Sequence, residues 1–280
     1  MNAPLNIRHD IRIPSVPAGV NRLMELLADD EIPFSQLATG LEPYTAICAR
    51  LIALANSAWA STSEPITTLD GACKHLGFNV VKSTAIALAV SSPFDAQKCP
   101  AFQSQRFWQD SLAVADTITT LCQKLDVQLN GDVQTYRTAA LLHSLGLMLL
   151  VDQMPEQTHK ALTQLSQPQR SSLSDLLTEH CGISYSDAAE QLFLAWQMPA
   201  ELTNIIAHQN LPDVAGEHQQ ASQLLHLSKQ LVSEYRHLNC NTDPQPLLKV
   251  TGVSLPTIDR IRQRLEPKME RIEKLASVLF

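Results

Sequence analysis

Hydrophobic side chains recur with helical spacing along most of the chain. Between residues 20 and 29, apolar side chains stand at Val20, Leu23, Met24 and Leu27, the i, i+3, i+4, i+7 pattern of one buried helix face. The same kind of spacing is found in residues 44–58, 104–125, 136–153, 172–182, 185–196, 199–209 and 221–236. Residues 78–90 are apolar nearly all round, which indicates a fully buried helix. No segment shows a convincing strand pattern, so the sequence predicts an all-α protein.

Proline, glycine and loop residues divide these helices. Pro65 precedes a short helix over residues 67–77, for which Thr67 or Thr68 is the expected N-cap and Gly77 the expected stop. A loop containing serines and prolines follows residue 90 and indicates a boundary between two helical subdomains. The predicted organisation is a tail over 1–13, subdomains over 14–98 and 99–240, and a C-terminal helical extension over 241–280 that is broken at Pro267.

Charge and composition narrow the class of protein. The chain has 28 acidic and 21 basic residues, a formal net charge of −7, which disfavours general binding to nucleic acid or to anionic membranes. Six scattered cysteines without a C-x-x-C pair predict neither a zinc ribbon nor a redox motif. The N-terminus lacks the apolar core of a signal peptide, and no apolar run approaches the ~20 residues of a membrane helix. We therefore expect a cytoplasmic protein with reduced cysteines.

Motifs in both halves follow one another in a known order. The first half has IPSVPAGVNRLMELLAD, then Leu51 to Trp59 with the turn N-S-A, then Ile66 to Ala72 followed by L-G. The second half has FWQDSLAVA, AALLHSLGLMLL, EHCGISYSDAAEQLFLAWQMP and IIAHQ. In order and spacing these resemble the HDOD family of bacterial signalling proteins over roughly residues 14–235. The resemblance implies a multi-helix fold of two subdomains, the second similar to HD-type metal phosphohydrolases.

In HD-type hydrolases, histidines and aspartates from several helices hold one or two metal ions, which activate water for attack on a phosphoester. The resemblance implies that this chain departs from that pattern. The corresponding positions hold Asp110 in place of a histidine, His143-Ser144 in place of the His-Asp pair, Tyr185 in place of a histidine, His208-Gln209 in place of a His-His pair, and Lys229 in place of an aspartate. Because two histidines rarely suffice for a catalytic cation, we expect a degenerate site with no cofactor.

Other interpretations of these residues stay open. Asp110 could join His143 and His208 as a two-histidine, one-carboxylate set for Fe(II) or a similar ion, although Lys229 and Tyr185 would crowd it. Alternatively, His143 is a hydrogen-bonded core residue and Asp110 pairs with Lys229 or His143. The ammonium of Lys229, where a carboxylate is expected, also raises the hypothesis of an anion site.

The tryptophans and the N-S-A turn have structural interpretations. We expect Trp59, Trp108 and Trp196 to be packing residues. Asn56 and Ser57 are expected to cap and turn the first subdomain rather than to contact a ligand.

The C-terminal segment LLKVTGVSLPTIDRIRQRL resembles a helix-turn-helix string, in which Arg260, Arg262 and Arg264 would suit phosphates. Pro256 at the start of the second helix and the acidic net charge argue against DNA binding. We favour a helical hairpin packed on the body of the protein, with its turn over Thr251 to Thr257.

Together these features predict a non-catalytic signalling or regulatory module that binds a signalling protein partner or a small signal molecule between its subdomains. No G-G-D-E-F, E-A-L or receiver motif accompanies it, so a stand-alone version is expected. Two alternatives are a divergent metal-dependent phosphohydrolase using Asp110, His143 and His208, and a DNA-binding regulator acting through the C-terminal segment.

Overall fold

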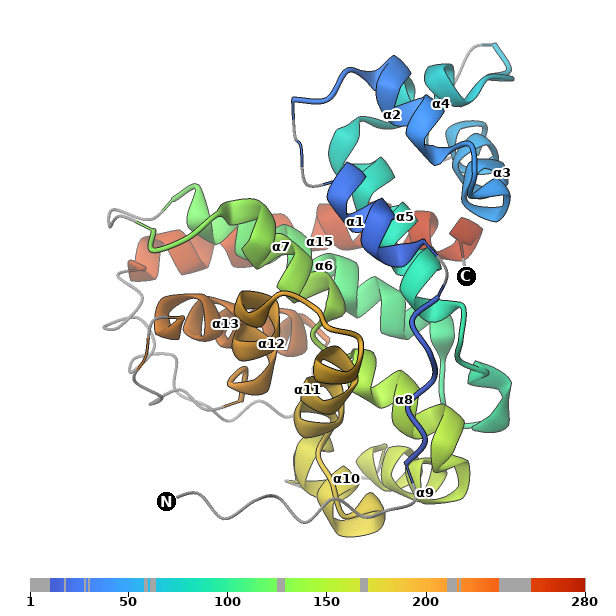
Figure 1. The fold of residues 1–280 in the computed structure, drawn as a ribbon. Coiled ribbons are helices and arrows are strands. Elements are labelled where there is room, and N and C mark those ends of the chain that lie inside the picture. The colour runs from blue at the N-terminus through green and yellow to red at the C-terminus, as the bar shows by residue number, and fades with distance from the viewer. Residues whose placement is uncertain are drawn as a thin grey trace.

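The fold consists of helices and the segments that join them (Figure 1). The computed structural model describes residues 11–17, 19–27, 29, 31–57, 60, 64–124, 129–166, 171–210, 216, 218–236 and 253–279. Its helices are α1 (Val20–Leu26), α2 (Phe34–Leu41), α3 (Thr45–Ala55), α4 (Leu69–Leu76), α5 (Phe78–Ser91), η1 (Ala96–Lys98), α6 (Ser104–Cys122), α7 (Val133–Leu142), α8 (Leu145–Gln153), α9 (Pro155–Leu165), α10 (Leu173–Cys181), α11 (Tyr185–Ala195), α12 (Ala200–Ala207), α13 (Gln219–Tyr235) and α15 (Leu255–Leu279). No strand occurs in the described residues, and the all-α prediction is confirmed.

Helices α1 to α5 lie together at one end of the molecule (Figure 1). Thr68 caps α4 by accepting a hydrogen bond from the backbone nitrogen of Gly71, and Gly77 ends the helix with a φ of 79°. Asn56 follows α3, and its side chain bonds both the backbone nitrogen and the backbone oxygen of Ile66. The predicted capping roles of Thr68, Gly77 and Asn56 are therefore confirmed.

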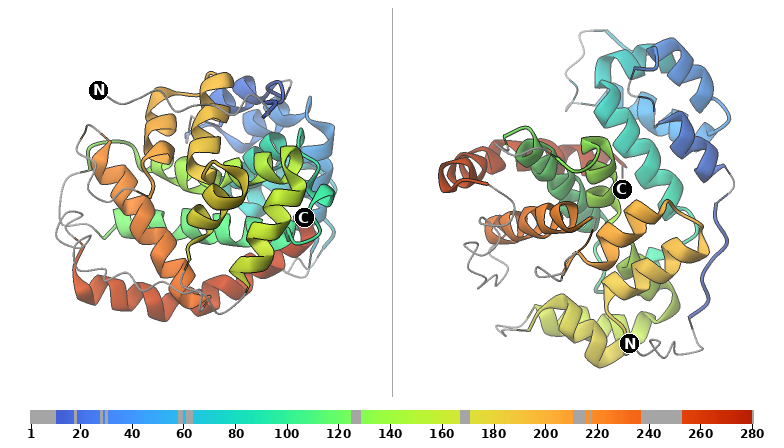
Figure 2. Two further views of the ribbon diagram at one scale, coloured as in Figure 1. Left: turned by 90° about the horizontal axis from the view of Figure 1, so that it is seen from below. Right: turned by 60° about the vertical axis from the view of Figure 1, so that its left-hand side comes forward.

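The second part of the chain is built around α6, a buried 19-residue helix. Helices α7, α13 and α15 pack against α6, while α8 packs against α11 and α11 against α12. Helices α9 and α10 pack on each other at the end farthest from α1–α5 (Figure 2). The buried leucines, alanines and aromatic side chains of these helices form one continuous core with those of α1–α5. None of the described helices is both long and apolar enough to span a membrane.

Helix α15 contacts both parts of the molecule, because it packs against α6 and α13 and also against α3. Its apolar face, with Ile258, Ile261, Leu265 and Met269, is buried. The predicted break at Pro267 was wrong, since the helix runs through this residue. The neighbouring buried side chains and the ion pair from Lys268 to Asp116 stabilise the helix where proline removes one backbone donor. The proposed first arm of the hairpin, before residue 253, lies outside the described residues.

Residues 11–17 form an extended segment that leads to α1 (Figure 1). The indole nitrogen of Trp196 donates to the backbone oxygen of Pro14 at 2.8 Å. Trp108 and Trp196 are both buried, as a packing role requires, whereas Trp59 lies outside the described residues. The N-terminal segment is thus tied to the second half of the chain.

Candidate functional site

A break between two helices shapes the first side of the site. The sequence predicted a single helix over residues 136–153, but α7 ends at Leu142 and α8 begins at Leu145. His143 lies at the break with 7% of its surface exposed, and its Nδ1 donates to the backbone oxygen of Ala140 at 2.7 Å. The interpretation of His143 as a hydrogen-bonded core residue is confirmed.

Gly146 lets the first turn of α8 pack directly on α11. A Cβ atom at this position would collide with the backbone oxygen of Tyr185 and the backbone nitrogen of Ala189. The close approach requires glycine for lack of space rather than for a special backbone angle. Tyr185, the first residue of α11, is thereby placed beside the α7–α8 break.

Lys229 of α13 is the centre of the site. Its ammonium lies 2.8 Å from the hydroxyl oxygen of Tyr185, 2.8 Å from Oε1 of Gln209 and 2.6 Å from Oδ1 of Asn210. It also lies 5.3 Å from the centroid of the Tyr185 ring. Since an ammonium has three donors, these three neutral oxygens use all of them. No carboxylate of the described residues forms an ion pair with Lys229.

Gln209 connects Lys229 to the α7–α8 break. It is fully buried in the turn after α12, and its Nε2 donates to the backbone oxygen of His143 at 2.7 Å while its Oε1 accepts from Lys229. The backbone oxygen of Gln209 lies 2.9 Å from Nδ1 of His226. Burial and the nearby ammonium of Lys229 lower the pKa of His143 to about 3, so its ring is neutral at pH 7.

Asp110 faces a different partner. Its Oδ1 accepts from Nε of Arg236 at 3.0 Å, and the same guanidinium reaches Glu273 of α15 and Gln109 of α6. The expected pairing with Lys229 or His143 was wrong, because an arginine at the end of α13 binds this carboxylate instead. Burial raises the pKa of Asp110, and the charge of Arg236 opposes that shift.

The remaining candidate residues lie at the margin of the site. Nδ1 of His208 bonds the backbone oxygen of Asn204 within its own helix, and its side chain is more exposed than that of His143. The hydroxyl of Ser144 lies 3.3 Å from that of Ser111 on α6. The structure thus brings together Lys229, Tyr185, Gln209 and the backbone of His143, but gives Asp110, Ser144 and His208 other partners.

The sequence profile of the HDOD domain family matches residues 13–212, well over half of the chain. The chain belongs to the HDOD domain family. The match ends before α13, so Lys229 and α15 follow the matched part of this HDOD protein. No curated protein sequence matches the chain.

Solved structures share the HDOD fold along nearly the whole chain. A candidate signal transduction protein from Marinobacter aquaeolei VT8 has a TM-score of 0.85 at 21% identity; the alignment covers 99% of this chain and 63% of that one. An HDOD domain protein of unknown function from Geobacter sulfurreducens has a TM-score of 0.74 at 18% identity, covering 96% and 94%. A candidate phosphohydrolase from Shewanella amazonensis SB2B has a TM-score of 0.70 at 20% identity, covering 95% of each chain. At these identities the likeness shows the fold.

The residues of this HDOD site do not fit a divalent metal. A catalytic metal needs three or more histidine or carboxylate ligands converging on one point. Within the described residues, no three His, Cys, Asp or Glu side chains are grouped in this way. The three oxygens that do converge all accept from the Lys229 ammonium, whose charge opposes a second cation. For the same reason Lys229 has no donor left for an anion, so the geometry gives no support to an anion site there.

Two residues of the site were not identified from the sequence. Asn210 accepts from both Lys229 and Tyr185, and Arg236 binds Asp110. The signal for Asn210 was its position directly after His208-Gln209, since the side chains of Gln209 and Asn210 both accept from Lys229. No local signal pointed to Arg236, which is 126 residues from Asp110 in the sequence.

Proposed function

We propose that this HDOD protein is a non-catalytic signalling module in which Lys229 has replaced the metal of an HD-type site. The observation that carries the proposal is the set of three hydrogen bonds from the Lys229 ammonium to Tyr185, Gln209 and Asn210. A tethered cation holds these groups together without a bound ion. A divalent cation at the same place would meet a repulsion on the order of several kcal/mol at an effective dielectric constant of about 20.

Without a metal, this site has no means of activating water for attack on a phosphoester. The buried, neutral ring of His143 and the amide of Gln209 then serve packing and positioning. The module would act by binding a signalling protein partner or a small signal molecule. Membership of the HDOD family and the fold likeness to a candidate signal transduction protein support this role.

The alternative is a divergent metal-dependent phosphohydrolase, a class suggested by the name of the Shewanella relative. A hydrolysis assay distinguishes the two. We expect the purified protein to show no turnover of bis(4-nitrophenyl) phosphate above the protein-free rate with Mn²⁺, Fe²⁺ or Mg²⁺. Metal-dependent turnover that is lost in His143→Ala and kept in His75→Ala, a histidine remote from this site, would contradict the proposal.

A further inference from the structure

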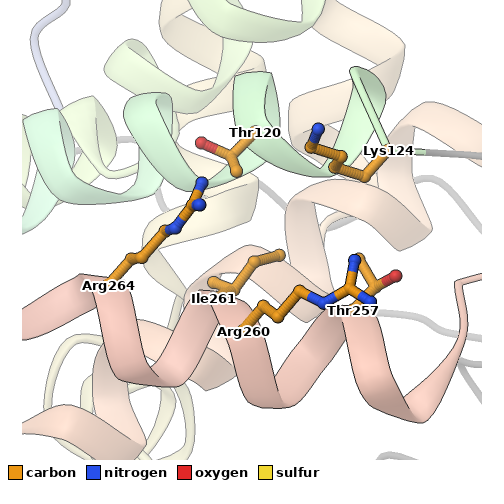
Figure 3. A pocket seen from close by; sticks show the side chains of 6 residues that line it. All are labelled: Thr120, Lys124, Thr257, Arg260, Ile261 and Arg264. Carbon is orange, nitrogen blue, oxygen red and sulfur yellow. The ribbon is translucent and has the colours of Figure 1, made fainter.

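A small hollow lies between α6 and α15, away from the Lys229 site (Figure 3). It is lined by Thr120, Lys124, Thr257, Arg260, Ile261 and Arg264. Its volume is about 80 Å³, compared with the roughly 10–15 Å³ that a single water molecule needs on the same measure, so a group of several atoms has room to enter. Buried Ile261 forms an apolar floor, whereas the three basic side chains are exposed to solvent.

Where α6 and α15 pack together, their side chains carry opposite charges at one end of the contact and charges of the same sign at the other. At one level, Lys268 of α15 binds Asp116 of α6 and also donates to the hydroxyl of Thr120. About two helical turns further along, Lys124, in the turn after α6, and Arg260 of α15 line the same hollow. The two helices run antiparallel here, because residue numbers rise on α6 where they fall on α15. The charge of Lys268 is therefore balanced by Asp116, whereas the side chains that line the hollow carry a net positive charge.

The basic side chains of the hollow have no partners among the described residues. Arg262, on the same helix, contrasts with them, because it binds Glu234 of α13 and Asp259. No such ion pair joins Lys124, Arg260 or Arg264 to a described carboxylate. In Figure 3, Arg264 reaches from α15 toward Thr120, and the guanidinium of Arg260 lies beside Thr257. Three positive charges without a partner among the described residues thus gather in a chain whose net charge is −7.

We propose that this hollow binds the phosphate group of a small soluble molecule. Guanidinium groups bind phosphate oxygens with two parallel hydrogen bonds, and a phosphate carries enough negative charge to balance several cations. The hydroxyl of Thr257 adds a donor when the neighbouring hydroxyl of Ser254, 2.9 Å away, donates to it. Thr120 already donates to the backbone oxygen of Asp116 and accepts from Lys268, so it contributes no further donor. This proposal is independent of the non-catalytic role proposed for the Lys229 site.

A small ligand suits this geometry better than nucleic acid. Tight duplex binding uses a row of phosphate contacts, roughly 6 to 10 in salt-sensitive binders, whereas the described residues that line the hollow include three cations. Ile258, Ile261 and Leu265 of α15 are also buried, so this face of the helix packs on the body of the protein, as the hairpin interpretation expects. The helix-turn-helix interpretation therefore receives no support from the described part of α15.

Titration calorimetry with sodium pyrophosphate at low salt tests the proposal. We expect saturable binding to the wild-type protein, weakened about tenfold or more in the double variant Arg260→Gln, Arg264→Gln. Lys124→Gln, in the turn after α6, should also weaken binding. Arg262→Gln removes the same charge outside the hollow and should keep nearly wild-type affinity. Thermal melts would show that each variant is folded.

Three results would overturn the proposal. The first is the absence of measurable pyrophosphate binding to the wild-type protein at low salt. The second is equal weakening in Arg262→Gln and in the double variant, which would indicate a diffuse charge effect. The third is steeply salt-dependent binding of a DNA duplex without pyrophosphate binding, which would favour a nucleic-acid surface.

Discussion

The side-chain amide nitrogen of Gln209 donates to the backbone oxygen of His143 at 2.7 Å. Both residues stand at positions where the family resemblance places metal ligands, and both are buried. The amide of Gln209 therefore bonds on both sides, because its nitrogen donates to His143 and its oxygen accepts from Lys229. These hydrogen bonds join the end of α7 to α13 through the turn after α12.

The first prediction concerns Gln209. Replacing it with leucine leaves the ammonium of Lys229 and the backbone oxygen of His143 each short of one buried partner. We expect Gln209→Leu to lower the free energy of unfolding by about 2–3 kcal/mol. Among the described residues its neighbour His208 bonds only Asn204 of its own helix turn, so His208→Gln should cost less than about 1 kcal/mol. Urea denaturation measures both, and equal losses would contradict the account.

Lys229 itself gives the second prediction. Lys229→Met keeps much of the side-chain volume but leaves Oε1 of Gln209 without its donor and removes one of the two donors to Oδ1 of Asn210. We expect a loss of about 2 kcal/mol or more in the free energy of unfolding. Lys74 is a suitable control, since it is exposed and paired only with Asp70 on its own helix, and Lys74→Met should cost less than about 1 kcal/mol. A Lys229→Met variant as stable as wild type would show that these bonds contribute nothing.

Gly146 supplies a test of the packing between α8 and α11. Gly146→Ala places a methyl group against the backbone of Tyr185 and Ala189, so the two helices must separate. We expect a destabilisation of about 3 kcal/mol or more, or failure to fold. Gly216→Ala, where a Cβ would meet nothing within 4 Å, is the control and should stay close to wild type. Chemical denaturation of both variants checks the prediction.

The pH dependence of stability follows from His143. Its pKa in the folded protein is about 3, below the usual 6.5, so the unfolded chain binds more protons between these values. Stability should therefore be complete above about pH 6.5 and fall as the pH drops toward 3. From pH 7 to 4.5 the contribution of His143 amounts to about 2–3 kcal/mol. His143→Gln should show a flatter decline in unfolding free energy over this range, and an identical decline would contradict the assignment.

Local features of the fold were predictable from the sequence, and long-range pairings were not. Thr68, Gly77 and Asn56 act through neighbours within ten residues, so turn and capping rules were sufficient. The break at His143-Ser144 was missed because the apolar pattern continues on both sides of it. At Pro267 the sequence predicted a break that is not there, since tertiary packing keeps α15 continuous through this residue.

The sequence predicted which positions form the site but not which side chains pair with each other. The family resemblance placed Tyr185, Gln209 and Lys229 together, and the structure brings them into contact. Which groups pair depends on side-chain reach across helices that are far apart in the sequence. Asp110 therefore forms its ion pair with Arg236 rather than with Lys229, and no sequence pattern predicts this pairing.

Elemental analysis tests the central claim most directly. The purified protein would be measured before and after incubation with Mn, Fe, Zn and Mg salts, followed by removal of unbound ions. We predict well below one metal ion per chain under every condition, because in the proposed site the ammonium of Lys229 takes the place of the cation. About one tightly held ion per chain, lost in His143→Ala or His208→Ala, would contradict this account and support a metal-dependent enzyme.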